Sequence, residues 1–225
     1  MKEPLPTMFI KRWITRFTLA LAASFLCAAG FGVIAMLIGS GVINGWDRAV
    51  IAAVQGTESP GLTAVMKLLS LIGEKVPVAL ITAAAGLFLF TVLGHRKELL
   101  LLAISVGGAG ALNVLLKLLF QRARPTIYRL ADAPGYSFPS GHSMAAFCLY
   151  ATIAYLLWRH IPHKAGRALL IAVSTLFIAA IGYSRIYLGV HYPSDVVGGY
   201  LASGCWLFGL IWAYSGFGKN LRSDP

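Results

Sequence analysis

The sequence predicts an all-α membrane protein with six transmembrane helices, and two observations support this fold class. Hydrophobic residues occupy 58% of the 225 positions and charged residues only 12%, whereas soluble domains average about 45–50% apolar and about 25% charged residues. The apolar residues also fall into runs of roughly 20, which is the length an α-helix needs to cross a bilayer. Short polar gaps separate the runs, so we expect a single integral-membrane domain over residues 1–225.

The N-terminal region combines a basic start with a long apolar run. Residues 1–16 are polar and carry four basic side chains, and an apolar run of about 25 residues follows from 17 to 41. This run is longer than the core of a signal peptide, which spans about 7–15 residues. We therefore expect a retained first span that follows a cytoplasmic N-terminus.

Residues 42–75 are less apolar and more charged than the runs on either side. Their hydrophobic residues recur at helical spacing, and Ser59-Pro60 is a typical helix start. The segment is too charged and its helices are too brief to span a bilayer. It predicts short amphipathic helices that lie at the outer membrane interface.

Five further apolar runs are expected to cross the membrane. The third span contains Gly107, Gly108 and Gly110, which allow close contact with another helix. A polar loop, 121–141, follows the third span, and a basic loop, 159–167, follows the fourth. The expected second to sixth spans are residues 76–93, 99–120, 142–158, 168–187 and 196–214.

The distribution of basic residues predicts the orientation. Six spans place both termini on one side, together with 11 of the 19 Lys and Arg residues. Because basic loops stay in the cytoplasm, both termini are expected there, with the protein in the inner (plasma) membrane. Interaction with anionic lipid headgroups and membrane orientation explain most of the basic residues that give the net charge of +11. The sequence has no arginine-rich tract with interleaved aromatic residues that would suggest nucleic-acid binding.

Cysteine usage excludes a disulfide framework or a cysteine metal centre. Cys27, Cys148 and Cys205 each lie inside an apolar run, and their number is odd. They are expected to behave as small hydrophobic residues.

Polar residues are unusually dense in three stretches, each at the outer end of an expected span. Because these ends lie on the same side of the membrane, the stretches can converge on one site. The stretches are Lys117 to Pro125, Pro139-Ser140-Gly141-His142, and Ser184-Arg185 continuing to His191 and Asp195.

The cations of these stretches predict a phosphate site. Lys117, Arg124 and Arg185 have few acidic residues near them, so a bound anion is a reasonable counter-charge. Ser140 and Gly141 mark a helix start, whose hydroxyl and free backbone N–H groups favour a phosphate. Each feature alone has a plainer interpretation: a span-end cation is commonly a membrane anchor, and Pro-Ser-Gly is commonly a cap.

Two histidines on the same side could perform the chemistry. His191 and Asp195 are one helical turn apart, so the carboxylate could orient the imidazole, as in other nucleophilic sites. One histidine would attack phosphorus, and the other, His142, would protonate the leaving oxygen. An Asp near an interfacial His is, however, commonly only a local hydrogen bond. Neighbouring cations disfavour a metal, so we expect no cofactor and activity without a divalent ion.

The combined pattern resembles the type 2 phosphatidic acid phosphatase superfamily. It contains Lys, six residues, Arg-Pro; then Pro-Ser-Gly-His; then Ser-Arg, five residues, His, three residues, Asp. The resemblance implies six membrane helices and a metal-free site near the outer surface. It also implies that His191 is the nucleophile, His142 the general acid and Asp195 the partner of His191. The implied phosphate-binding residues are Lys117, Arg124, Ser140, Gly141 and Arg185.

The small size of the chain resembles the bacterial membrane-bound branch of that superfamily. This resemblance implies a lipid substrate such as phosphatidylglycerophosphate, undecaprenyl pyrophosphate or phosphatidic acid, without an obligate protein partner. The alternatives are a phosphotransferase that uses the same site and a small anion transporter. Vanadium haloperoxidases share the anion site but are soluble, and a transporter would need cations at several membrane depths. Apolar residues do not identify which lipid is used.

Overall fold

The computed structural model describes residues 5–94, 96–126 and 128–220. Within these ranges all regular secondary structure is helical, as the sequence predicted. The helices are α1 (Leu5–Gly39), α2 (Asn44–Gln55), α3 (Pro60–Ile72), α4 (Lys75–Thr91), α5 (Arg96–Phe120), α6 (Gly141–Leu157), η1 (Trp158–His160), α7 (Lys164–Tyr187) and α8 (Pro193–Asn220).

The predicted membrane-spanning architecture is confirmed, with one change at the second span. Five described helices are long and apolar enough to cross a bilayer. Helix α4 has 17 residues, or about 26 Å at 1.5 Å per residue. Helix α4 is long and apolar enough to cross a bilayer only together with α3, and the two helices are bent by 59° relative to each other. The predicted second span, α4, thus forms a bent pair with α3, which has the form of a broken span or of a re-entrant loop.

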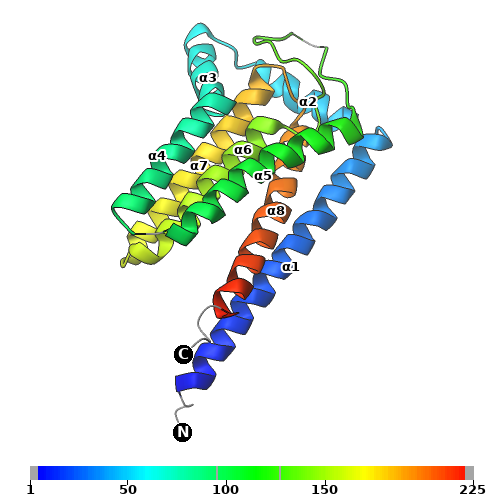
Figure 1. Ribbon diagram of the computed structural model, residues 1–225. Helices are drawn as coiled ribbons and strands as arrows, with labels where there is room; N and C mark the ends of the chain where they lie inside the picture. The colour runs from blue at the N-terminus through cyan, green and yellow to red at the C-terminus, as the bar shows by residue number, and fades with distance from the viewer. Residues whose placement is uncertain (1–4, 95, 127, 221–225) are drawn as a thin grey trace.

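The site-bearing segments lie at one end of the bundle, and both chain termini lie at the other (Figure 1). Helix α1 runs beside α8, while α4, α5, α6 and α7 lie together on the other side of α8. Helix α2 and the 121–140 loop cross the end that is remote from the termini. Residues 1–4 and 221–225 of the expected cytoplasmic termini lie outside the described residues.

Small residues bring α1 and α8 into close contact. A Cβ on Gly30 would lie 3.2 Å from the Leu201 side chain, and one on Gly204 would lie 2.7 Å from the Cys27 sulfur. The Ser24 hydroxyl donates to the Cys205 carbonyl at 2.8 Å. Close packing and interhelical hydrogen bonds are the interactions that hold helices together in lipid, so α1 is an integral part of the helix bundle.

Trp206 of α8 packs directly against α5 at Gly108. A Cβ on Gly108 would overlap the indole ring, and the indole N–H donates to the Ser105 carbonyl at 3.1 Å. The Ser105 hydroxyl in turn pairs with that of Thr152 on α6 at 2.8 Å. The close contact predicted for this glycine cluster is thus made by Gly108, whereas a Cβ on Gly107 or Gly110 would meet nothing within 4 Å.

Replacing Gly108 by alanine is expected to lower thermal stability. The new methyl group must displace the Trp206 ring, and overpacking of this kind costs about 1–3 kcal/mol. Gly107→Ala is the matched control, since its methyl group would enter open space. Thermal unfolding of both purified variants in detergent measures the difference. Equal stability of the two variants would contradict the packing.

Two helix starts that the sequence predicted are confirmed, and one loop is shorter than expected. Ser59 caps α3 by accepting from the Leu62 N–H at 3.4 Å, and Ser140 caps α6. The expected 159–167 loop is instead largely helical, because α7 begins at Lys164.

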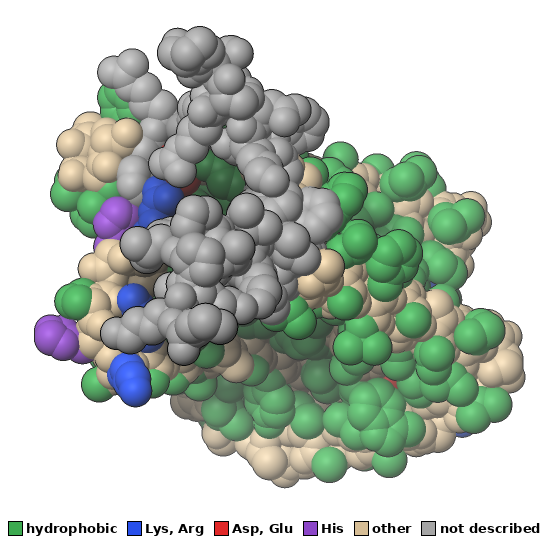
Figure 2. All heavy atoms as spheres, turned by 90° about the horizontal axis from the view of Figure 1, so that it is seen from below, with side chains coloured by type: hydrophobic (Ala, Val, Ile, Leu, Met, Phe, Trp, Pro, Cys, Tyr) green, Lys and Arg blue, Asp and Glu red, His purple; other side chains and the backbone are tan. Residues whose placement is uncertain are grey.

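The surface agrees with a membrane-embedded bundle. Figure 2 looks at the end where the chain termini lie, and hydrophobic side chains cover much of the surface that is not grey. Lys, Arg and His side chains gather at one side of this end. A basic patch bordering a hydrophobic surface is typical of a membrane boundary.

Candidate active site

The three polar stretches predicted from the sequence meet at the end of the bundle that is remote from the termini. The first stretch ends α5 and enters the 121–140 loop, the second begins α6, and the third joins α7 to α8. Backbone contacts join the second and third stretches, because the Ser140 N–H donates to the Asp195 carbonyl at 3.0 Å. The first joins the third through Arg122, whose guanidinium donates to Asp195 Oδ1 at 2.7 Å.

The turn between α7 and α8 fixes His191. Gly189 has a φ of +69°, and a Cβ there would overlap the Tyr128 carbonyl, so only glycine fits this turn without strain. The Val190 and His191 N–H groups both donate to the Arg185 carbonyl, at 3.2 and 3.3 Å. His191 is therefore held directly against the last turn of α7.

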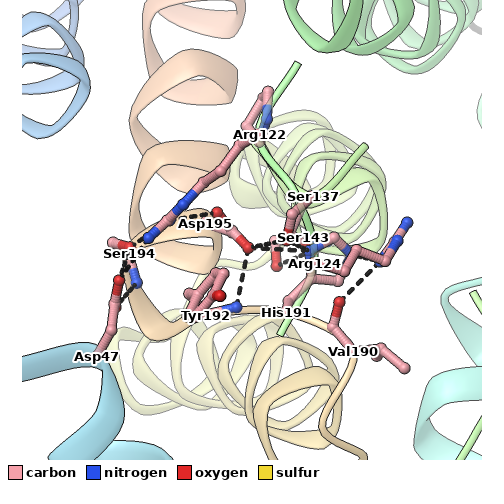
Figure 3. A network of polar contacts seen from close by, with 12 residues as sticks. Asp47, Arg122, Arg124, Ser137, Ser143, Val190, His191, Tyr192, Ser194 and Asp195 are labelled. Carbon is pink, nitrogen blue, oxygen red and sulfur yellow. Dashed lines mark hydrogen bonds and ion pairs between the residues drawn. The ribbon is translucent and has the colours of Figure 1, made fainter. Parts of the chain in front are cut away.

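Both ring nitrogens of His191 have charged partners (Figure 3). Nδ1 lies 3.3 Å from Asp195 Oδ2, and Nε2 lies 3.1 Å from Arg124 Nη1. A guanidinium can only donate hydrogen bonds, so Nε2 must be the acceptor nitrogen and Nδ1 must carry the proton. The lone pair of Nε2 thus points toward the cation of Arg124.

Backbone carbonyls hold the Arg124 guanidinium in place. Nε donates to Gly135 at 3.0 Å, Nη2 to Pro134 at 3.0 Å, and Nη1 to Val190 at 2.7 Å. The first two contacts lie within the 121–140 loop, and the third joins this loop to the turn that carries His191. A cation fixed in this way is already oriented for an anion.

Asp195 is completely buried and accepts hydrogen bonds from several directions. Oδ2 accepts from the Ser137 hydroxyl and from the Tyr192 N–H, the latter at 2.8 Å, besides facing His191. Oδ1 accepts from Arg122 Nη1 at 2.7 Å. The carboxylate therefore has a single fixed orientation relative to His191.

Ser140, Gly141 and His142 form the first turn of α6. The Ser140 hydroxyl accepts from the Ser143 hydroxyl at 2.9 Å and keeps its own proton for a ligand. The Asn113 side chain donates to the Pro139 carbonyl at 3.0 Å and packs against Gly141. This contact fixes the start of α6 against α5.

His142 and Arg185 retain buried nitrogen atoms without a partner. His142 Nε2 and Arg185 Nε make no hydrogen bond with any residue that the structure describes. Arg185 is 4% exposed and donates from Nη1 to the Ser70 hydroxyl of α3. Gly73, at the end of α3, lies against the His142 ring, and a Cβ there would be 3.0 Å from its Cδ2. Buried donors normally have partners, so these atoms are suited to a ligand.

Lys117 lies in the last turn of α5 and is half-buried. Its side-chain ammonium group makes no hydrogen bond or ion pair with another described residue, while its backbone carbonyl accepts from the Gln121 N–H at 3.0 Å. Its charge nevertheless acts on His142, as do the charges of Arg124, Arg185 and His191. The predicted site residues thus form one electrostatic group, although His142, Gly141 and Lys117 do not touch the His191–Asp195 pair.

Burial determines the protonation state of His191. It lowers the pKa of His191 to about 4, although the hydrogen bond and charge of Asp195 act in the opposite direction. Burial also lowers the pKa of Arg124, which stays cationic. At neutral pH the site therefore contains a neutral imidazole beside a guanidinium.

Sequence reasoning missed three polar residues of this network. Ser137 contacts Asp195, and Arg122 joins Asp195 to Asp47 of α2, which is 0% exposed (Figure 3). Arg122 lies inside the stretch from Lys117 to Pro125 but was not among the predicted phosphate-binding residues, and Asp47 lies outside all three polar stretches. The sequence signal that could have pointed to Arg122 is its position two residues before Arg124, a predicted site residue.

The family model described as the PAP2 superfamily matches residues 98–219, which is more than half of the chain. The chain belongs to the PAP2 superfamily. Phosphatidylglycerophosphatase B of Bacillus subtilis is 33% identical over 198 residues, covering 85% of this chain and 93% of the relative. A decaprenylphosphoryl-5-phosphoribose phosphatase of Mycobacterium tuberculosis is 36% identical over 159 residues, covering 68% and 82%.

A solved PAP2 structure has a similar fold. It is the crystal structure of a transmembrane PAP2 type phosphatidylglycerolphosphate phosphatase from Bacillus subtilis, which superposes with a TM-score of 0.79 at 29% identity. The match covers 90% of this chain and 99% of that one. The family resemblance and the fold class predicted from the sequence are therefore both confirmed.

Proposed function

We propose that this protein is a membrane lipid phosphate phosphatase that works through a phosphohistidine at His191. The observation that carries the proposal is the neutral imidazole whose Nδ1 faces Asp195 and whose Nε2 lone pair faces Arg124. A phosphate bound by Arg124 would take over that contact and place phosphorus in front of the lone pair. Nucleophile, orienting carboxylate and anion-binding cation are then arranged for in-line attack.

In this mechanism the side chains of Lys117, Arg124 and Arg185 hold the phosphoryl oxygens. The Ser140 hydroxyl and the N–H groups at Gly141 add donors at the start of α6. These groups neutralise the charge that spreads over the oxygens in the transition state. The free Arg185 Nε and the 121–140 loop that holds Arg124 support this assignment.

The reaction proceeds in two displacements. His191 Nε2 attacks phosphorus, the bond from phosphorus to the leaving oxygen breaks, and His142 gives that oxygen a proton. Asp195 stabilises the positive charge that forms on the His191 ring. His142 then removes a proton from water, the hydroxide oxygen bonds to phosphorus, and the phosphorus–nitrogen bond breaks to release phosphate.

The proposed substrates are lipid phosphates: phosphatidylglycerophosphate, undecaprenyl pyrophosphate or phosphatidic acid. The names of the two curated relatives support this class, because one refers to a phospholipid phosphate and the other to a polyprenyl-linked phosphate. The bilayer would present the substrate, with no nucleic acid or obligate protein partner involved.

We also propose that residues 1–225 form a single phosphatase domain in the inner membrane. The contact of α1 with α8 supports a single domain. Both termini would be cytoplasmic, with the amphipathic segment 42–75 and the motifs at 117–195 at the outer face. The excess of basic residues on the side of the termini supports this orientation.

Purified protein in detergent is expected to release phosphate from at least one lipid of this panel with a chelator present. Because cations, and not a metal, would hold the phosphate, chelation should change the rate by less than about twofold. Vanadate, which mimics five-coordinate phosphorus, should inhibit strongly. Loss of activity on chelation would contradict the metal-free mechanism. Transfer of phosphate to an added acceptor alcohol would instead identify a phosphotransferase.

A further inference from the structure

Asp47 is a buried acid outside the three polar stretches and outside the segment matched by the family model. It lies on the short helix α2 and is 0% exposed. Its Oδ2 accepts from Arg122 Nη2 at 2.8 Å and from the Ser194 hydroxyl at 2.6 Å, and its Oδ1 accepts from the Ser194 N–H at 2.9 Å. A carboxylate buried to this extent is retained only with such partners.

Arg122 connects Asp47 to the candidate catalytic pair. Its Nη1 lies 2.7 Å from Asp195 Oδ1 and donates to the Ser194 hydroxyl at 2.7 Å. Its guanidinium carbon lies 4.0 Å from the centre of the Tyr192 ring, so stacking holds the plane of the fork. Arg122 therefore bridges two carboxylates with a fixed geometry that lysine could not reproduce.

The charges in this chain of contacts alternate. Asp47 is negative, Arg122 positive and Asp195 negative, and the ring of His191 becomes positive when it bonds to phosphorus. Without Asp47, the buried guanidinium would be balanced by Asp195 alone. Asp195 would then stabilise the positive imidazole less, because interactions between charges are strong in a buried site.

We propose that Asp47 and Arg122 are positioning residues for the reaction, with Arg122 aiming Asp195 at His191 and Asp47 balancing the charge of Arg122. The proposal rests on the proposed phosphatase function and on the assignment of His191 as nucleophile. It gives α2, a helix of the outer amphipathic segment, a defined part in the chemistry.

The pH dependence of kcat/KM distinguishes this positioning role of Asp47 and Arg122 from a purely structural one, which would not shift the acidic limb in opposite directions in the two variants. The groups that face or lie close to His191 are Asp195 of α8, Arg124 of the loop, Arg185 of α7 and His142 of α6. Since the acidic limb of kcat/KM reports ionisation of the free enzyme, it should follow the pKa of His191, which is about 4. Asp47→Asn removes a negative charge and should move the limb to lower pH. Arg122→Gln removes a positive charge and should move it to higher pH.

The experiment compares Asp47→Asn, Arg122→Gln and the double variant with Arg48→Gln, an exposed neighbour on α2. We expect each single variant to lose about 10- to 100-fold in kcat, the range for groups that orient a histidine through another residue. KM should change much less, because neither residue touches the substrate. The double variant should have a limb close to that of wild type, and Arg48→Gln should match wild type throughout.

Arg122→Lys provides a further test if a neutral variant unfolds in detergent. This variant keeps the positive charge but loses the two-pronged guanidinium, so kcat should fall while the acidic limb of kcat/KM stays at the wild-type pH. Limbs of Asp47→Asn and Arg122→Gln that coincide with that of wild type would overturn the proposal, as would equal shifts of the two in one direction or an unchanged kcat in Arg122→Lys. Wild-type protein that releases no phosphate from any lipid phosphate would instead refute the proposed function, which separates the two failures.

Discussion

Replacing His191 by alanine is expected to lower kcat for lipid phosphate hydrolysis by roughly 10⁴- to 10⁶-fold, as when other covalent nucleophiles or their partners are removed. The ring is the group whose Nε2 faces Arg124, the proposed phosphate-binding cation, and no other described histidine contacts Asp195. Water alone would have to attack a phosphate that remains bound. Phosphate release by purified protein measures the loss.

Trapping the intermediate distinguishes the two histidines of the site. After rapid acid-free quenching of a reaction with radiolabelled substrate, wild type should carry an acid-labile label, and His191→Ala should carry none. His163→Ala is the matched control, since His163 lies at the opposite end of α7. Full labelling of His191→Ala would transfer the role of nucleophile to His142.

Arg124→Lys has the second largest expected effect, a loss of about 10²- to 10³-fold in kcat/KM, which is typical of removing one oriented donor from a transition-state site. Lysine keeps the charge. It cannot donate to Pro134, Gly135 and Val190 together, so the cation would no longer be held in a fixed orientation between the 121–140 loop and the His191 turn.

Vanadate inhibition tests whether Arg124 acts on the phosphoryl group. The inhibition constant should rise in parallel with the loss of kcat/KM, because vanadate mimics the transition state. Arg129→Lys is the control, since this exposed arginine of the same loop donates to the Pro125 carbonyl and to no other described residue. An unchanged inhibition constant in Arg124→Lys would contradict a role in phosphate binding.

Much of the fold could be predicted because the membrane limits the possible structures. A chain in lipid must satisfy its backbone within each span, so apolar length alone locates helices such as α5 and α7. The end of α3 was harder to place. Gly73 is buried where α3 bends into α4, but nothing in the local pattern shows that it lies against His142, 69 residues later.

The candidate site was predictable where spacing along the chain carries the geometry. His191 and Asp195 are four residues apart, and the start of α8 places one turn of backbone between them. The contact between Asp47 and Arg122 spans 75 residues, with α3, α4 and α5 between the two positions. From composition, an acid in a short outer helix is expected to be solvated, so only the folded chain reveals that Asp47 is buried.

The buried Asp47 also limits how this enzyme can be divided. The segment matched by the family model begins at residue 98, after Asp47. A fragment with that boundary would retain the signature residues and lose the acid that balances Arg122. Removing one partner of a buried ion pair costs about 3–5 kcal/mol. The fragment would also lack α1, so the face of α8 that packs against α1 would be uncovered. We therefore expect that the segment matched by the family model does not fold as an autonomous unit, and that grafting its motifs onto another membrane helix bundle requires an acid equivalent to Asp47.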